Sequence, residues 1–356
     1  MTRVKLIGDA SPATAYSRVN SVWMRGLEAA GYRIGREGEA DVVIHHDYSQ
    51  HFATCPAGAS ERRVAVRTWD FGPFPRSWAD RIGRDFDRLW VHSEWVRQKA
   101  LESGVARGLV AVVPHGVDPS VFRPHGPAAD LDPTFNFLFV GATVARKGVD
   151  ILLRAYAQAF APDEAVCLIL KGHSGDVFYR GQQMTDLIAG FQRDPRKPRL
   201  RHLDTYLSEE DLAALYRAAD VGVFPYRAEG FAIPILEAMA CGLPCIVPRF
   251  GACLDYCNEE NAFFVEPRRI RVPVRREMTF NTLGFREQVD AVDFCEVPVA
   301  ELAAALRAAF EGDADARRAR GDAAARTVHG SWTWDCSIAR MLQLLVELQS
   351  LTARRP

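Results

Sequence analysis

The sequence lacks an excess of either charge, a long apolar run and an N-terminal hydrophobic segment. Its 356 residues include 44 Lys and Arg against 45 Asp and Glu, so no basic field exists to attract DNA or RNA. The apolar residues after Met1 are too few for the hydrophobic region of a signal peptide. The most apolar stretch, residues 231–248, contains Glu237 and prolines 234 and 244, which argues against a membrane-spanning helix. We therefore expect a cytoplasmic protein that has no transmembrane segment and binds no nucleic acid.

Two nucleotide-binding signatures are also missing. No G-x-G-x-x-G follows an expected strand, and no G-x-x-x-x-G-K-[ST] occurs anywhere in the chain. These absences argue against a Rossmann dehydrogenase and against a phosphate-loop nucleotidase.

The eight cysteines are scattered along the chain, which is typical of reduced thiols and not of a disulfide framework. Four of them follow the pattern C-x3-C-x7-C-x3-C, at residues 241, 245, 253 and 257. A structural zinc site is the alternative to four small buried side chains, and we favour the buried side chains.

Short apolar segments alternate with segments of helical periodicity, which is typical of a parallel sheet covered by helices. In the first series we expect strands at residues 4–8, 41–46, 63–68, 89–92 and 109–114 and helices at 17–30 and 94–103. After a proline-rich linker at 119–133, a second series has strands at 137–141, 166–171, 221–225 and 244–247 and helices at 148–160, 209–219 and 234–241. This order predicts an α/β fold of two Rossmann-like, doubly wound domains that face a cleft.

The expected domains are residues 1–125, residues 126–335 and a C-terminal segment, 336–356, that packs back across the first domain. An amphipathic helix at 338–351 would do this packing. Residues 268–276 hold five arginines in nine positions, for which we favour a solvated loop. Contact with an anionic acceptor or a membrane surface is the alternative.

One stretch of the second series carries the chemistry, E-G-F-A-I-P-I-L-E-A-M-A-C-G-L-P from Glu229 to Pro244. Its prolines and Gly242 predict a helix that is apolar all round except for Glu237. Glu229 then lies in the loop before that helix. On one continuous helix the two glutamates would be about 12 Å and about 80° apart, so the loop must fold back if both contact one ligand. Amides after Gly230 would favour a phosphate at the helix N-terminus.

This stretch resembles the E-x7-E signature of the retaining glycosyltransferases of family 4, which have the GT-B fold. Residues 139–150, with A-R-K-G-V-D, look like the family's strand and K-G-x-D element. Residues 113–118, V-P-H-G-V-D, are similar to its P-N-G-V-D element, and S-W-T-W at 331–334 resembles a late aromatic segment. The resemblance covers most of residues 109–350, and it is specific in the second domain and thin in the first.

The resemblance implies a role for each matched residue. Glu237 would accept hydrogen bonds from the ribose hydroxyls of a nucleotide sugar, and Glu229 would contact the donor sugar. Lys147, helped by Arg146, would neutralise the diphosphate as it leaves. The donor phosphates would bind the amides of Gly230, Phe231, Ala232 and Ile233. Lys171, at the end of a strand, is a donor-site candidate or a surface lysine.

The chain departs from the family pattern at two places. Ala142 stands where the family often has arginine, and the loop around Tyr16 has no Gly-Gly pair. In the first domain, His46 is a candidate for the donor sugar or a satisfied core histidine. Asp70 lies in the aromatic segment W-D-F-G-P-F-P, which is either an acceptor loop or a packed turn.

These observations favour a retaining, metal-independent hexosyltransferase that uses a UDP- or GDP-sugar and needs no cofactor. Its acceptor would be a carbohydrate, a lipid or a small molecule. A metal-dependent GT-A enzyme would want D-x-D near a strand end, whereas D-A-D at 313–315 lies in a helical stretch. A GT-B phosphorylase and a nucleotide-sugar-binding protein with a decayed site are the alternatives.

Overall fold

The first domain is built on a six-stranded parallel sheet. The computed structural model describes residues 2–8, 15–35, 40–46, 61–172, 182–274, 278–279, 286–287 and 289–350. The sheet has the strand order β2-β1-β3-β4-β5-β6. Its strands are β1 (Arg3–Ile7), β2 (Arg33–Ile34), β3 (Val42–His45), β4 (Arg62–Arg67), β5 (Arg88–Val91) and β6 (Val110–Val112). Helices α1 (Ala15–Ala29), α2 (Arg76–Asp85) and α3 (Glu94–Glu102) connect them, and the 3-10 helix η1 (Arg107–Leu109) precedes β6.

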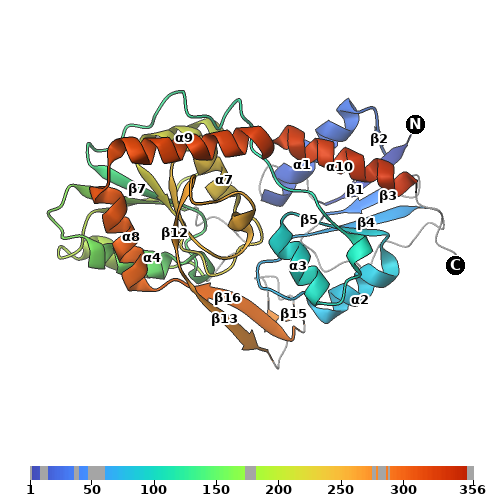
Figure 1. The fold of residues 1–356 in the computed structure, drawn as a ribbon, viewed down its shortest axis with the longest axis horizontal. Helices are drawn as coiled ribbons and strands as arrows, with labels where there is room; N and C mark the ends of the chain where they lie inside the picture. The colour runs from blue at the N-terminus through green and yellow to red at the C-terminus, as the bar shows by residue number, and fades with distance from the viewer. Residues whose placement is uncertain are drawn as a thin grey trace.

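The second domain repeats this plan with the strand order β12-β11-β10-β7-β8-β9, again all parallel. Its strands are β7 (Phe135–Val140), β8 (Val166–Lys171), β9 (Leu200–Leu203), β10 (Val221–Val223), β11 (Cys245–Pro248) and β12 (Ala262–Val265). The connecting helices are η2 (Ala145–Lys147), α4 (Val149–Ala159), α5 (Thr185–Arg193), α6 (Glu209–Ala218), α7 (Ile233–Ala240) and η4 (Ala252–Asp255). The expected α/β fold of two Rossmann-like, doubly wound domains is confirmed, and Figure 1 shows them as two lobes.

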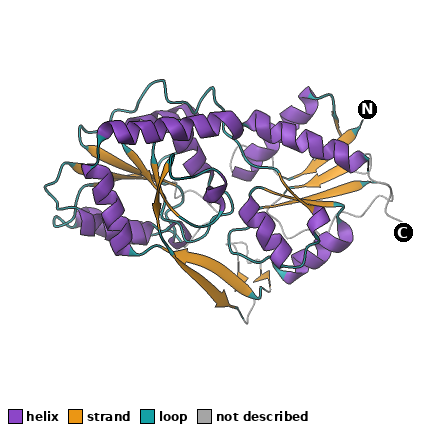
Figure 2. Cartoon of the chain, viewed as in Figure 1, coloured by secondary structure: helices purple, strands orange, loops and turns teal. Residues whose placement is uncertain are grey.

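Both sheets bury apolar strands between helices, as parallel sheets require. Strands β8 and β11 are buried along their whole length. Figure 2 shows the helices on the two faces of each sheet. The chain between residues 119 and 133 forms no helix or strand, in agreement with the predicted linker.

The C-terminal part of the chain crosses from the second domain to the first. Helices α8 (Val299–Glu311) and α9 (Ala314–Ser331) belong to the second domain, and α10 (Trp334–Gln349) continues over the first (Figure 1). The crossing is tied to the chain after β6, because the Val117 N–H donates to Trp332 O and the Trp334 N–H donates to Val117 O. Met341, Leu345 and other residues of α10 then join the core that α1 forms with the first sheet.

Two further strands form an antiparallel ribbon, here called the arm, that the sequence analysis missed. They are β13 (Arg268–Pro273) and β16 (Ala291–Glu296), paired in the register Arg268↔Glu296 to Pro273↔Ala291. The solvated loop expected at 268–276 is therefore wrong for residues 268–273; residues 275 and 276 lie outside the described residues. The many arginines of β13 do not give the alternation of polar and apolar residues by which a strand is predicted. All six residues are nevertheless exposed to solvent, as expected. Two short strands, β14 (Met278–Thr279) and β15 (Arg286–Glu287), pair with each other.

The arm leaves the second domain and packs on the first. The Asp293 N–H donates to Phe71 O, and Lys99 Nζ lies 2.6 Å from Asp293 Oδ2. Val289 and Val292 enter the apolar cluster of the first domain that contains Trp78 and other aromatic residues. Strand β16 of the arm thus connects the two domains.

Buried histidines lie close together at the carboxyl edge of the first sheet. His92 stacks on His115 with 3.8 Å between ring centroids, and His46 lies 5.4 Å from His92. Burial lowers the pKa of His92 to about 4 and keeps the pKa of His115 well below its usual range. Burial, with the charge of Arg67, also lowers the pKa of His45 to about 4. These rings are therefore neutral at neutral pH.

We predict that Gly116→Ala destabilises the protein by about 2 kcal/mol, because the crossing leaves no room for a side chain. A Cβ at Gly116 would overlap the backbone of Thr333 and Trp334. Gly108→Ala, in η1, is the matched control, since a Cβ there meets nothing within 4 Å. Urea unfolding of both variants measures the difference. Equal stability of the two would refute this account of the crossing.

We also predict acid lability from the buried histidines. Their pKa is about 6.5 in an unfolded chain and lower in the folded protein, so only the unfolded state gains protons as the pH falls from about 6.5 towards 4. The stability is therefore complete above pH 6.5 and decreases below it, by about 2 kcal/mol at pH 5 for a histidine such as His92.

His92→Asn tests this prediction. The Asn amide can replace the bond of His92 Nδ1 to Val113 O but cannot be protonated. Chemical unfolding at pH 7.5 and pH 5.0 should show a smaller loss of stability for this variant than for the wild type. His125→Asn, at an exposed histidine, is the control. The prediction is wrong if His92→Asn loses as much stability as the control.

Candidate functional site

The candidate site lies where the strand order of the second sheet reverses. Strands β7 and β10 are neighbours there, and the connections that leave them run to opposite sides of the sheet. Such a switch point leaves a crevice outside the carboxyl ends of the strands. A pocket with an empty volume of about 240 Å³ opens at this point. Its lining residues are Phe139, Val140, Lys147, Phe224, Tyr226, Glu229, Ala232, Pro234 and Ile235.

Lys147 and Glu229 meet beside this pocket. Lys147 ends the 3-10 helix η2 after β7, and Glu229 lies in the loop after β10, as the sequence predicted. Lys147 Nζ forms an ion pair with Glu229 Oε1, and Arg146 Nη1 lies 3.1 Å from the same oxygen. Burial raises the pKa of Glu229, but the charges of Lys147 and Arg146 outweigh it and hold the pKa below its usual range. The site therefore combines two cations with an ionised carboxylate.

Asp70 joins this cluster from the first domain. Its Oδ2 lies 3.2 Å from Arg146 Nη1, and its Oδ1 accepts a hydrogen bond of 2.6 Å from the Gly230 N–H. Burial raises the pKa of Asp70 more than the charge of Arg146 lowers it. A carboxylate from the other domain thus reaches the Gly230 amide, one of the amides that the sequence assigned to the donor phosphates. Ser93 Oγ–H also donates to Gly230 O.

Helix α7 places Glu237 apart from the Lys147–Glu229 pair. The helix is buried and has no side-chain cap, and Glu237 is 3% exposed. Arg18 Nη2 of α1 lies 2.7 Å from Glu237 Oε1, and the Tyr216 O–H donates to Oε2. Burial raises the pKa of Glu237 more than these two partners lower it. Arg18 was not among the predicted site residues, since no local sequence pattern signals an ion pair across two domains.

The other predicted donor-site residues surround the start of α7. Ala232 precedes the helix with a φ of 69°, a left-handed conformation that alanine seldom adopts, and Ile233 and Pro234 begin it. Phe231 is buried against the His115 ring at 4.8 Å, and the Tyr256 O–H donates to Phe231 O. Strained backbone of this kind is often found at functional sites.

Lys171 and His46 are not among the residues that line this pocket. Lys171 ends β8, where burial lowers its pKa and its Nζ donates to Gly172 O. His46 is fully buried, with Nδ1 2.6 Å from Asn20 Oδ1 and its ring stacked on Trp23. These contacts fit the core-histidine alternative for His46. The side chain of Tyr16 lies outside the described residues.

The cysteine pattern forms no metal centre within the described part of the chain. Cys241 ends α7, Cys245 begins β11, and Cys253 lies in η4. All three are buried, as is Cys257, whose sulfur lies 3.6 Å from the Met239 sulfur. Over the described ranges, no group of three or more His, Cys, Asp or Glu residues could hold a metal ion, and none of the helices is long and apolar enough to cross a membrane.

Part of the sequence matches a known family. Residues 134–272 match the family described as glycosyl transferases group 1. D-inositol 3-phosphate glycosyltransferase of Nocardiopsis dassonvillei is 27% identical over 238 residues, which cover 59% of this chain and 56% of that protein. O-antigen chain mannosyltransferase B of Escherichia coli is 39% identical over 112 residues, which cover 31% and 27%. The chain spans about half the length of the curated relatives that it matches first.

Solved structures match over nearly the whole chain. Sucrose-phosphate synthase of Thermosynechococcus elongatus has a TM-score of 0.72 at 18% identity, over 99% of this chain and 100% of the other. The Anabaena protein HepE, in complex with UDP and glucose, has a TM-score of 0.71 at 14% identity, over 98% and 100%. At such identities the likeness concerns the fold. The chain therefore has the GT-B fold, and its residues 134–272 match the glycosyl transferases of group 1.

Proposed function

We propose that the protein is a retaining glycosyltransferase that moves a hexose from a UDP- or GDP-sugar to an acceptor without a metal ion. The observation that carries the proposal is the group of Lys147, Arg146 and Glu229 beside the pocket at the switch point. Cleavage of a sugar–phosphate bond leaves negative charge on the nucleotide, and preorganised cations stabilise that charge. Lys147 and Arg146 supply two such cations in a largely buried setting.

Each predicted donor contact has a physical reason in this geometry. The phosphates would bind the backbone amides at the start of α7 and the guanidinium of Arg146. Glu237 would accept hydrogen bonds from the ribose hydroxyls. Glu229 is ionised and accepts hydrogen bonds only, which suits the hydroxyls of a donor sugar. In this proposal the leaving phosphate itself takes the proton of the acceptor, so no protein base is needed.

Two side chains of the first domain contact the groups that we propose for donor binding. The Asp70 carboxylate lies on the Gly230 amide and Arg146, as a phosphate oxygen would, and Arg18 pairs with Glu237. Donor binding would exchange both interactions for contacts with the nucleotide sugar. Such an exchange requires the two domains to move apart at these contacts when the donor enters.

The comparisons support the choice of donor class. The HepE structures contain UDP, UDP-glucose or both UDP and glucose, and two of the named relatives transfer a mannosyl group or act on inositol 3-phosphate. For this chain we propose a carbohydrate, lipid or small-molecule acceptor and a cytoplasmic location. The division at residues 125 and 335 is likewise proposed.

A thermal-shift screen of UDP, GDP, ADP and their sugars tests the donor class directly, because a ligand that binds only the folded state raises Tm. Turnover with an acceptor panel, followed by NMR of the anomeric proton of the product, then tests transfer and retention. Binding without product indicates the alternative of a nucleotide-sugar-binding protein. A dependence on inorganic phosphate as acceptor indicates a GT-B phosphorylase, and the absence of any nucleotide effect refutes the proposal.

Lys147→Ala should lower kcat by about 10²- to 10³-fold, because it removes a cation aimed at the developing charge. Steady-state kinetics at saturating donor measures the loss. Lys197→Ala, at an exposed lysine, should leave kcat unchanged. Normal turnover of Lys147→Ala would remove this lysine from the mechanism.

Asp70→Asn should tighten UDP binding by about fivefold or more, because it removes a negative charge of the first domain from the anion site. The Asn side chain can still accept the hydrogen bond of the Gly230 N–H. Isothermal titration calorimetry measures Kd, and Asp290→Asn, at an exposed carboxylate paired with Arg76, is the control. Weaker UDP binding would show that Asp70 helps to hold the nucleotide.

A further inference from the structure

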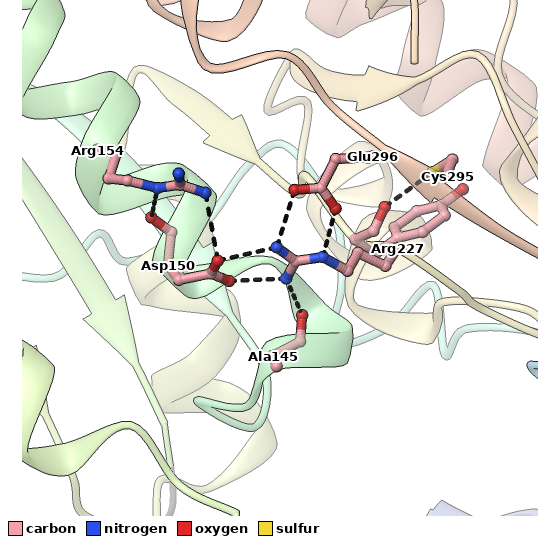
Figure 3. Close-up of polar contacts among 7 residues, drawn as sticks. Ala145, Asp150, Arg154, Arg227, Cys295 and Glu296 are labelled. Carbon is pink, nitrogen blue, oxygen red and sulfur yellow. Dashed lines mark hydrogen bonds and ion pairs between the residues drawn. The ribbon is translucent and has the colours of Figure 1, made fainter. Parts of the chain in front are cut away.

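Arg227 lies two residues before Glu229 and uses all of its hydrogen-bonding groups. Its Nη1 and Nη2 donate to the two oxygens of Asp150 at 2.7 and 2.8 Å. Its Nε and Nη2 donate to the two oxygens of Glu296 at 2.6 and 3.1 Å, and Nη1 also donates to Ala145 O (Figure 3). A guanidinium has five N–H groups, and here five acceptor atoms receive them.

The contacts of Arg227 reach both loops of the candidate site. Its backbone N–H donates to Arg146 O at 2.7 Å, and its side chain holds Ala145 O, so it binds the 3-10 helix η2 at two carbonyls. Arg146 Nη1 in turn donates to Ala228 O. A Cβ at Gly148 would overlap Pro225 O, so the two loops already touch there.

The second partner of Arg227 belongs to the arm. Glu296 is the last residue of β16, and the Cys295 N–H donates to Arg227 O at 2.8 Å. Asp293 lies three residues before Glu296 on β16. Its backbone N–H donates to Phe71 O, in the loop that carries Asp70. Strand β16 thus joins that loop of the first domain to Arg227 over about 10 Å.

We propose that Arg227 is a positioning residue that fixes Lys147 and Arg146 relative to Glu229, with Asp150 and the arm residue Glu296 as its two anchors. The inference rests on the proposed function, since it concerns the positions of Lys147 and Arg146, the two cations proposed to stabilise the leaving nucleotide. Arg227 is not among the residues that line the pocket, and it is bonded to the backbone of η2, so it acts through η2. A planar fork between two carboxylates fixes orientation as well as distance, which lysine cannot reproduce.

Arg227→Gln and Arg227→Lys should each lower kcat by about 10- to 100-fold, because a displacement of about 1 Å at a reacting centre costs that much. Tm should fall as well, because Asp150 and Glu296 lose their partner, and the donor KM should change less than kcat. Glu296→Gln should show a smaller loss of about threefold, since Asp150 still holds the fork. Arg154→Gln is the matched control, because Arg154 also contacts Asp150 but is 59% exposed at its side chain.

A double variant decides whether Arg227 acts through Lys147. In the Lys147→Ala background, Arg227→Gln should lower kcat less than threefold further, because the cation it positions is gone. If the losses in kcat of the two single variants multiply in the double variant, the proposal is overturned and Arg227 has a general structural role. If Lys147→Ala itself leaves kcat unchanged, the proposed function fails and not this inference alone.

Hydrogen exchange gives a readout that needs no turnover. Amides of residues 143–151 should exchange faster in Arg227→Gln than in the wild type and in Arg154→Gln, by more than the amides in the rest of the second domain do. Unchanged exchange in this segment would overturn the positioning role, whatever the enzyme assay shows. Faster exchange together with the non-additive kinetics would establish it.

Discussion

The ion pair between Lys147 and Glu229 depends on one property of the second sheet, the reversal of its strand order between β7 and β10. The two residues follow different strands, and the described chain between them contains helices α4, α5 and α6 and strands β8, β9 and β10. They meet because parallel neighbours deliver their carboxyl ends to the same edge. Gly148 then allows η2 to lie directly against the chain after β10, where any side chain would overlap Pro225 O.

Burial of charge explains why the first domain takes part in this site. Glu237 and Glu229 are 3% and 5% exposed, and a buried charge is costly unless another group compensates it. The charge of Glu229 is compensated by Lys147 of the second domain. The charge of Glu237 is compensated by Arg18, which lies on α1 of the first domain. Asp70 in turn pairs with Arg146. The contacts between the two domains at this site are therefore made by the same groups that we propose for donor binding.

Local sequence patterns predicted strands β7, β8, β10 and β11 and helices α4, α6 and α7 of the second domain, but not α5, β9 or β12. They also predicted the position of Glu229 before α7, because Pro234 and Gly242 mark the ends of that helix. They did not predict the arm, since the arginine-rich residues of β13 are exposed on both faces and show no alternation of burial. Arg18 and Arg227 were missed for another reason. Their importance comes from partners that are distant in sequence, such as Glu237 and Glu296, and no spacing within one element encodes such partners.

The arm changes how the two domains can move relative to each other. A cleft joined only by Asp70 and Arg18 could open by exchanging two ion pairs for ligand contacts. Strand β16 adds a backbone hydrogen bond to Phe71 and apolar side chains in the core of the first domain, which a nucleotide cannot replace. Because Glu296 at its other end is bound to Arg227, any opening that keeps the arm on the first domain pulls on the loops of Lys147 and Glu229. The two domains and the loops that carry Lys147 and Glu229 are thus linked through one strand.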